Sequence, residues 1–505
     1  MLNLEPLHDL KLEVYEPEEI VTELSVKNYL LFSELNGEVC AFICERYLVE
    51  ASNYYTKLEN KYPLHMLDED SFDRLYNRFL ELRTDKTMES MQEDNNEEGE
   101  DEDISLTDFL RTSSDILTSE ESAPIIKFVN ALFYQAVKKR ASDIHIEVQE
   151  KRGEVRFRID GMLVKNADLD KKVVNLIVSR IKVISNLDIS EKRIPQDGRT
   201  QIKIAGETLD IRVSVLPTFY GERVVMRLLM QSSQIPEITE LGFNSSLIGD
   251  VKKLLRSSHG IILVTGPTGS GKTTSLHSFL REVEKPEMNL ITVEDPVEYK
   301  SDNISQIQVN EKVGLTFAAA LRSILRQDPD VIMIGEIRDE ETAGIAVRAA
   351  LTGHLVFSTL HTNSAAATIS RLADMNIEPF LISSSLLGIL AQRLVRVLCN
   401  DCKVEDVIAE DFAADYNIPN DVKIYKAEGC KSCNYSGYEG RRSIGELLVM
   451  NDMVKELLKT TTDEHTIKTA LEAEGLKTIS RQLQGMLLDG ETSLDEAIRI
   501  GLGHA

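Results

Sequence analysis

A glycine-rich segment that ends in lysine and threonine is the most informative chemical feature of the sequence. It runs Gly266, Pro267, Thr268, Gly269, Ser270, Gly271, Lys272, Thr273, with Thr274 following. The pattern G-x-x-x-x-G-K-[ST] turns backbone N–H groups toward a phosphate, and its lysine reaches the β- and γ-phosphates. The apolar run 261–265 precedes it and a helix-compatible stretch follows, which is the context that a phosphate loop requires. We therefore predict nucleotide binding here, with the Thr273 hydroxyl placed to hold Mg²⁺.

Two acidic residues follow apolar runs downstream of this loop. Glu336 ends the segment DVIMIGE (330–336), and Glu294 lies in TVEDPVE (292–298). In a doubly wound sheet such strand ends lie beside the phosphate loop, where a carboxylate can hold Mg²⁺ or orient the attacking water. Glu294 alone is equally consistent with a turn or helix-capping acid. Two acidic strand ends near one loop favour the catalytic interpretation.

Two histidines flank a further apolar run. His354 and His361 bracket the segment LVFSTL (355–360). The run between them favours hydrogen bonding or phosphate sensing over a paired metal site. A buried histidine with satisfied hydrogen bonds is the alternative for each.

Four of the six cysteines form two C-x-x-C pairs in loop-like surroundings. These are Cys399, Cys402, Cys430 and Cys433. Each pair can present two thiolates on one turn, and two such turns complete a tetrahedral zinc site with no open position. The alternatives are four unliganded thiols or, less expected in the cytoplasm, a redox disulfide. Cys40 and Cys44 have no such partners and are expected in a hydrophobic core.

The strands and helices that must position these residues are predicted from two different patterns of apolar residues. Beyond about residue 241, continuous apolar runs alternate with helical patterns, which indicates a largely parallel sheet covered on both faces. Between 123 and 235, a helical pattern is followed by short segments in which apolar and polar residues alternate. That period-two alternation predicts half-buried antiparallel strands, hence an α+β domain, with arginines on the solvent-facing positions.

Length, composition and charge indicate the general class of the protein. Its 505 residues suggest about three domains, and 42% hydrophobic residues exclude a fully disordered protein. The net charge of −26 disfavours a general nucleic-acid coat, because neutralising phosphates requires an excess of Lys and Arg. The acidic run 89–103 predicts an extended linker. With neither a signal-like N-terminus nor an apolar stretch of roughly 18 residues, we expect a cytoplasmic protein.

The motifs of residues 123–500, taken together and in order, resemble those of the secretion-type ATPases. That family includes the type II secretion ATPase, general secretion pathway protein E, and the type IV pilus assembly ATPase. The matching segments are ASDIHIE (141–147), RIDG (158–161), RIPQDGR (193–199), DIRVS (210–214), GERVVMR (221–227), GPTGSGKT (266–273), TVEDPVE (292–298), DVIMIGEIRD (330–339), TGHLVFSTLHTN (352–363) and the two cysteine pairs. The combination is far more specific than any single motif.

The resemblance implies a multi-domain α/β fold. A RecA-like P-loop ATPase domain is preceded by an α+β PAS-like domain and is accompanied by a tetracysteine zinc lobe and a small N-terminal domain. The expected domains are 1–88 (N-terminal docking domain), 89–122 (acidic linker), 123–235 (PAS-like, arginine-bearing), 236–398 (RecA-like), 399–440 (zinc lobe) and 441–505 (C-terminal helical region).

The resemblance also assigns roles to residues. Arg199, Arg212 and Arg227 match the family's arginines that reach the γ-phosphate of an ATP held between the PAS-like and RecA-like domains, with Arg223 as second choice. From the residues alone these arginines would be a solvated strand face. Glu294, Glu336, His354 and His361 become parts of the catalytic apparatus, and Glu336 is the preferred residue for positioning or activating water.

The function implied is that of a Mg²⁺-dependent ATPase with ATP, magnesium and zinc as cofactors. It would work as a homohexamer at the cytoplasmic face of the inner membrane, attached through platform and docking proteins, with no direct binding of nucleic acid. Pilus retraction ATPases lack the tetracysteine lobe, so we expect a motor for pseudopilus or pilus assembly in type II secretion. The alternatives are pilus extension, pilus-like DNA uptake, a nucleic-acid motor and a nucleotide-gated scaffold that does not hydrolyse ATP.

Overall fold

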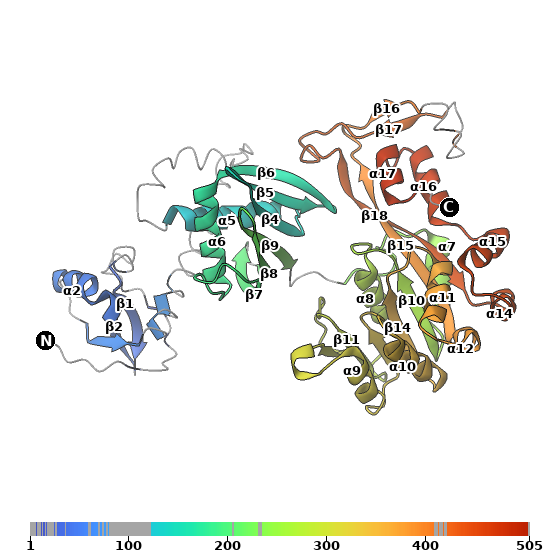
Figure 1. The fold of residues 1–505 in the computed structure, drawn as a ribbon, viewed down its shortest axis with the longest axis horizontal. Helices are drawn as coiled ribbons and strands as arrows, with labels where there is room; N and C mark the ends of the chain where they lie inside the picture. The colour runs from blue at the N-terminus through green and yellow to red at the C-terminus, as the bar shows by residue number, and fades with distance from the viewer. Residues whose placement is uncertain are drawn as a thin grey trace. The chain divides into compact units, whose positions relative to one another are not determined.

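The chain divides into two compact units, Met1–Met230 and Gln231–Ala505, which are described separately. The computed structural model describes residues 123–204, 207–230, 235–408 and 422–502, most of 28–58 and 62–68, and single residues elsewhere between 7 and 79 and at 413 and 418. The expected acidic linker, 89–122, lies outside the described residues. Figure 1 shows the elements in chain order.

The first elements of unit 1 form a three-stranded sheet. In this sheet β2 (Glu38–Cys44) pairs antiparallel with β1 (Leu31–Leu35) and parallel with β3 (Leu64–Leu67). Between β2 and β3 lie η1 (Glu45–Tyr47) and α2 (Leu48–Lys57). Cys40 and Cys44 are buried in the core of this sheet, which confirms the prediction that they are core residues.

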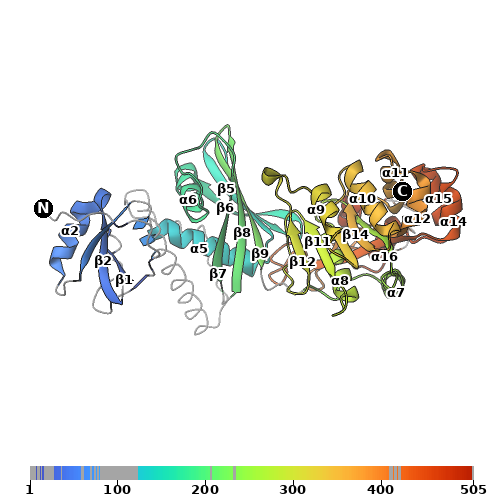
Figure 2. The same cartoon turned by 90° about the horizontal axis from the view of Figure 1, so that it is seen from below.

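The other elements of unit 1 form a six-stranded antiparallel sheet with two helices. They are α5 (Ala123–Lys138), β4 (Asp143–Val148), β5 (Arg152–Ile159), β6 (Met162–Asp170), α6 (Lys171–Ile184), β7 (Gln196–Ile204), β8 (Glu207–Thr218) and β9 (Gly221–Met230). The strand order is β6-β5-β4-β9-β8-β7. Both helices lie on one face of the sheet (Figure 2), where apolar side chains from helices and strands form one core. The other face carries the polar residues of the alternating segments, as the sequence predicts.

A seven-stranded sheet organises unit 2. Its elements are α7 (Ser245–Leu254), β10 (Gly260–Thr265), α8 (Lys272–Val283), β11 (Leu290–Glu294), β12 (Ser305–Gln308), η3 (Glu311–Val313), α9 (Phe317–Ile324), β13 (Val331–Ile334), α10 (Glu340–Leu351), β14 (Leu355–Leu360), α11 (Ala365–Asp374), α12 (Pro379–Ser385), β15 (Leu386–Leu398) and β18 (Tyr438–Val449). The order is β12-β11-β13-β14-β10-β15-β18. All neighbouring pairs are parallel except β15 and β18.

Both faces of this sheet are covered. Along β10, Ile261 and Leu263 belong to the core formed with α9 to α12, whereas Ile262 and Val264 belong to the core formed with α7 and α8. A strand whose two faces are both buried needs apolar residues at every position. This is why the sequence shows continuous runs here, and it confirms the predicted parallel sheet.

The remaining elements of unit 2 follow β15. A two-stranded hairpin consists of β16 (Val404–Asp406) and β17 (Ile424–Lys426), and β18 then returns antiparallel to β15. The chain continues with α14 (Asp452–Leu458), α15 (Glu464–Ala473), α16 (Ile479–Leu488) and α17 (Leu494–Ile500). β18 crosses residue 440, where the sequence analysis placed a boundary. Among the described residues, no helix combines the length and apolar character needed to cross a bilayer.

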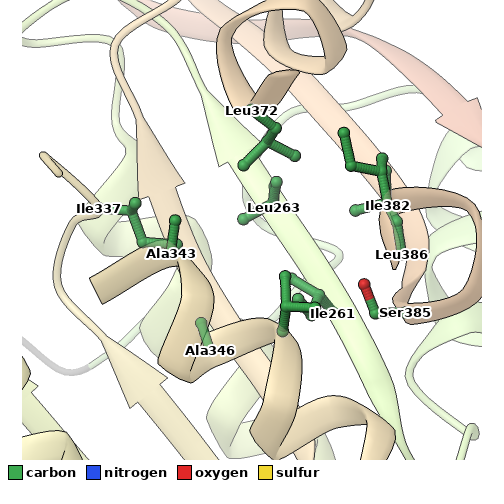
Figure 3. A pocket seen from close by; sticks show the side chains of 10 residues that line it. Ile261, Leu263, Ile337, Ala343, Ala346, Leu372, Ile382, Ser385 and Leu386 are labelled. Atoms are coloured by element: carbon green, nitrogen blue, oxygen red, sulfur yellow. The ribbon is translucent and has the colours of Figure 1, made fainter. Parts of the chain in front are cut away.

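A small internal space lies beneath the sheet of unit 2 (Figure 3). Its volume is about 10 Å³. Its lining is Ile261, Leu263, Ile337, Ala343, Ala346, Val347, Leu372, Ile382, Ser385 and Leu386. A space of this size barely holds one water, and its lining is almost wholly apolar. It is a packing void and not a ligand site.

Candidate functional site

The glycine-rich loop joins the end of β10 to the start of α8 through two positions that require glycine. Gly266 has a φ of 149°, and a Cβ there would lie 2.5 Å from Ser270 Oγ. Gly271, the N-cap of α8, has a φ of 88°. Glycine adopts such angles without strain, so the chain can turn sharply into the helix. The unpaired N–H groups of the first helical turn, with the positive end of the helix dipole, form a site for phosphate.

Lys272 lies across this loop. Its Nζ donates to Gly266 O at 2.8 Å and to Pro267 O at 3.1 Å. Burial lowers the pKa of Lys272 to about 8; nearby Glu336 opposes this shift, and Arg393 adds to it. Two buried cations beside a loop of N–H donors favour an anionic ligand, and a bound phosphate would raise the pKa of the lysine again. Thr273, next in the chain, is exposed and free to offer its hydroxyl to Mg²⁺.

Gln392 on β15 forms hydrogen bonds with the glycine-rich loop and with α8. Its side chain is fully buried, its Nε2 donates to Ser270 O at 2.7 Å, and its Oε1 accepts from Ser275 Oγ at 2.8 Å. Sequence reasoning missed this residue, because one amide within an apolar strand forms no motif. The only available signal was the polar pair Gln392-Arg393 within the otherwise apolar stretch 386–395.

Glu336 lies two residues beyond β13 and contacts two neighbouring side chains. Arg338 donates to Glu336 Oε1, and His361 Nε2 lies 3.3 Å from Glu336 Oε2. Burial alone raises the pKa of Glu336, but the hydrogen bonds and charges of Arg338 and His361 outweigh it and lower the pKa. Glu336 is therefore a carboxylate at neutral pH, suited to a metal ion or to orienting a water. Arg338 was not singled out in the sequence analysis.

The two histidines lie at opposite ends of β14. His361 follows the carboxyl end and reaches Glu336, whereas His354 precedes the amino end, where its carbonyl accepts from Gly260 N at 3.1 Å. β10 and β14 are parallel, so the phosphate loop shares the end of the sheet that carries His361. Six strand residues separate the two ends by about 20 Å. The structure thus does not bring His354 to the loop; its Nδ1 instead contacts Ala349 O at 2.8 Å.

Glu294 ends β11 and is buried, with only 3% of its surface exposed. Its Oε1 accepts from Thr292 Oγ1 at 2.6 Å and from Gln306 Nε2 at 3.1 Å, and its Oε2 lies 3.1 Å from His277 Nε2. Burial alone raises the pKa of Glu294, but the His277 contact, with the other hydrogen bonds, lowers it. His277 was also missed, because a single histidine on a helix gives no signal of a partner 17 residues away.

The strand order explains why these groups meet. β11, β13, β14 and β10 are consecutive neighbours in the sheet, and all run in the same direction. Their carboxyl ends carry Glu294, Glu336, His361 and the phosphate loop, respectively. In an open parallel sheet, ligands bind beyond these ends. The structure therefore brings together, at one edge, a phosphate cradle, a cation, a threonine hydroxyl and two ionised carboxylates.

The predicted arginines of unit 1 form a row across its six-stranded sheet. In the pairing register Arg199 lies opposite Arg212, and Arg212 lies opposite Arg227. Like charges that are directly opposite on neighbouring strands are destabilising, so the row favours an anionic ligand. The three line a cavity of about 400 Å³ together with Asp143 and Asp197. That volume is within the range of small-molecule sites.

A carboxylate partly offsets the positive charge at the Arg227 end of the arginine row. Asp143 Oδ1 lies 3.3 Å from Arg227 Nε. Arg223, the second choice, is instead paired with Glu147 at 2.7 Å and does not line the cavity. The structure therefore groups the three preferred arginines and separates Arg223 from them.

The four cysteines of the two C-x-x-C pairs converge. All are free thiols, and their sulfurs lie within 4.8 Å of one another. The Sγ–Sγ distances are 3.9 Å for Cys399–Cys430, 3.8 Å for Cys402–Cys433 and 3.7 Å for Cys430–Cys433. A tetrahedron with Zn–S bonds of about 2.3 Å requires sulfurs about 3.8 Å apart. The residues therefore fit zinc and are too far apart for disulfides.

The backbone around Cys433 favours the thiolate of this one cysteine, whereas burial raises the pKa of Cys402. The N–H groups of Cys430 and Gly437 both donate to Cys433 Sγ at 3.2 Å. Burial alone raises the pKa of Cys433, but these donors outweigh it and lower the pKa to about 7. Thiolate is the form that binds zinc.

We predict one zinc per chain in the purified protein, measured by elemental analysis. Cys430→Ser with Cys433→Ser should remove the zinc and lower the unfolding temperature by several degrees, because metal binding to the folded chain stabilises it. Cys40→Ala, in the core of the small sheet, is the matched control and should keep the metal. Zinc-free wild-type protein with four titratable thiols in this cluster would refute the assignment.

Comparisons with known proteins show which family the chain belongs to. Residues 118–499 match the family model described as type II/IV secretion system protein. The chain is 45% identical over 441 residues to type II secretion system protein E of Aeromonas hydrophila, which covers 87% of each chain. It is 49% identical over 404 residues to type II secretion system ATPase E of Vibrio cholerae, covering 79% of this chain and 80% of that one.

Solved structures show the same fold. The crystal structure of the pilus retraction motor PilT with bound ADP matches with a TM-score of 0.50 and 28% identity, over 73% of this chain and 96% of that one. The Legionella pneumophila ATPase DotB matches with a TM-score of 0.55 and 22% identity, over 74% and 95%, which supports the fold alone.

Proposed function

The chain belongs to the type II/IV secretion system protein family and is an ATPase, and from this premise we propose that it is the motor of type II protein secretion. It would hydrolyse ATP to power assembly of a pseudopilus or pilus. The observation that carries the proposal is the phosphate loop with Lys272, placed beside the ionised Glu336 at one sheet edge. Two relatives, 45% and 49% identical to this chain, are named type II secretion system protein E and type II secretion system ATPase E. Their names support type II secretion as the process that the motor serves.

In the proposed reaction, the chain's own residues bind the nucleotide and place the water. The N–H groups at the start of α8 hold the phosphates, and Lys272 moves its hydrogen bonds from the loop carbonyls to the β- and γ-oxygens. Thr273 and Glu336 would hold Mg²⁺, which neutralises charge on the phosphates when bound. Because its pKa is lowered, Glu336 serves better to orient the attacking water than to remove its proton fully.

The remaining assignments extend this proposal. We propose that the arginine row of the PAS-like domain binds nucleotide phosphates, since its guanidinium groups suit phosphate oxygens. We also propose a zinc ion in the tetracysteine lobe, a homohexameric assembly, the domain scheme predicted above, and attachment through partners at the cytoplasmic face of the inner membrane. The assembly and its location are those that the resemblance of the motifs implies.

The experiment is an affinity capture from native cells with Glu336→Gln as bait, since this variant should hold the ATP-bound state. Bound proteins are identified by mass spectrometry, and Lys272→Ala serves as the matched nucleotide-free bait. Capture of an inner-membrane platform protein of a secretion system supports the proposal. A pilus or competence platform would reassign the motor to pilus-type assembly, and DNA-processing proteins with no platform would contradict it.

A further inference from the structure

The pair His277–Glu294 links the phosphate-loop helix to the strand end beside it. His277 lies on α8, one helical turn beyond Thr273, and none of its surface is exposed. Its Nε2 is 3.1 Å from Glu294 Oε2, while its Nδ1 is buried and has no hydrogen-bond partner among the described residues. The Glu294 contact is thus the one polar interaction of this imidazole in the described part of the chain. With its proton on Nε2, the ring donates to the carboxylate.

Glu294 in turn organises the loop that follows β11. Gln306 Nε2 donates both to Glu294 Oε1 at 3.1 Å and to Tyr299 O at 2.8 Å, and the Ser301 N–H donates to Gln306 Oε1 at 2.9 Å. A carboxylate that is 3% exposed is thereby tied, through one amide, to Tyr299 and Ser301 at the far end of the loop 295–301.

A second contact joins the same loop to α8. Tyr299 packs its ring 5.1 Å from that of His277, and its hydroxyl lies 3.0 Å from Thr274 Oγ1. The loop begins with Asp295, whose Oδ2 lies 3.7 Å from Arg338, the residue that donates to Glu336. A continuous path of contacts therefore runs from His277 through Glu294 and this loop to Arg338 and Glu336.

We propose that His277 is a positioning residue for ATP hydrolysis: it fixes Glu294, and through Glu294 the loop 295–301 and the Arg338–Glu336 pair. The inference rests on the proposed function of this site. A hydrogen bond to a carboxylate is roughly twice as strong as one between neutral groups. Removing the His277 donor leaves Oε2 of this buried carboxylate without its hydrogen bond. Because neither His277 nor Glu294 contacts the phosphate loop carbonyls that hold Lys272, nucleotide binding should depend little on the pair.

The test compares His277→Phe with His277→Gln in the full chain. Phenylalanine fills the ring's space without donating, whereas glutamine keeps an amide donor. We expect kcat to fall about tenfold in His277→Phe and to recover to within about threefold of wild type in His277→Gln. The Kd of a fluorescent, non-hydrolysable ATP analogue should change less than about twofold in both. His465→Phe, at an exposed histidine on α15, is the matched control and should leave both constants unchanged.

A double-mutant cycle separates positioning from simple packing. If His277 acts through Glu294, then adding His277→Phe to Glu294→Gln should lower kcat no further than Glu294→Gln does alone. Unchanged kcat in His277→Phe would overturn the inference. So would equal losses of kcat and analogue affinity in both His277 variants together with a lower unfolding temperature, since that pattern indicates a structural role. A wild-type chain without turnover would overturn the proposed function itself, and the inference with it.

Discussion

Lys272→Ala should abolish measurable ATP binding. The variant removes the only side-chain cation that the loop itself supplies to the β- and γ-phosphates. It also leaves two loop carbonyls, those of Gly266 and Pro267, without their donor. Two hydrogen bonds from a charged donor to phosphate correspond to a loss of affinity of about 100-fold or more. The measurement is a titration of the full chain with a fluorescent ATP analogue in Mg²⁺.

The control for this prediction is Lys285→Ala, an exposed lysine shortly after α8. It removes the same charge from the same unit without touching the loop, and its affinity should equal that of the wild type. The unfolding temperature of both variants shows whether the fold is intact. Wild-type affinity in a folded Lys272→Ala would mean that nucleotide binds elsewhere.

Glu336→Gln should separate binding from chemistry. Glutamine has nearly the same shape as glutamate but carries no charge, so it can neither hold Mg²⁺ as an anion nor orient water as strongly. The structure keeps this carboxyl ionised through Arg338 and His361. Losing one preorganised electrostatic contact at a reacting centre costs about 100-fold or more in kcat. We expect this loss in steady-state phosphate release, with the analogue Kd within about threefold of wild type.

Glu287→Gln, at an exposed position in the same unit, is the matched control and should keep full turnover. If Glu336→Gln hydrolyses ATP at the wild-type rate, Glu336 has no part in the chemical step. Asp295, which faces Arg338 at 3.7 Å, would then be the next residue to test.

The elements of the sequence that were predicted well are those with a local signal. The apolar runs 261–265, 290–293, 331–334 and 355–358 became parallel strands because both of their faces are buried, which leaves no alternation in the sequence. The phosphate loop and the cysteine pairs were recognised because their chemistry demands fixed spacing. Glu336 followed from its position after an apolar run, whereas a catalytic role for His361 came only from the family resemblance.

What the sequence did not reveal are contacts between segments far apart in the chain. Gln392 reaches Ser270 across 122 residues, and no periodic pattern marks either partner. His277 meets Glu294 only because α8 packs against the sheet in which β11 ends at Glu294. His354 was predicted to be part of the site but does not lie there. It precedes the amino end of β14, whereas the phosphate loop and His361 lie at the carboxyl ends of the strands. Its motif membership gave no information about which end of the strand faces the nucleotide.

Continuous phosphate release by the purified full chain measures whether this chain hydrolyses ATP at the phosphate loop. The assay compares wild type with Mg²⁺, wild type with the metal chelated, and Glu336→Gln with Mg²⁺, all without nucleic acid. We expect multiple turnovers in the first case alone. Absence of turnover there, or equal turnover in Glu336→Gln, would contradict it, as would release that requires added DNA.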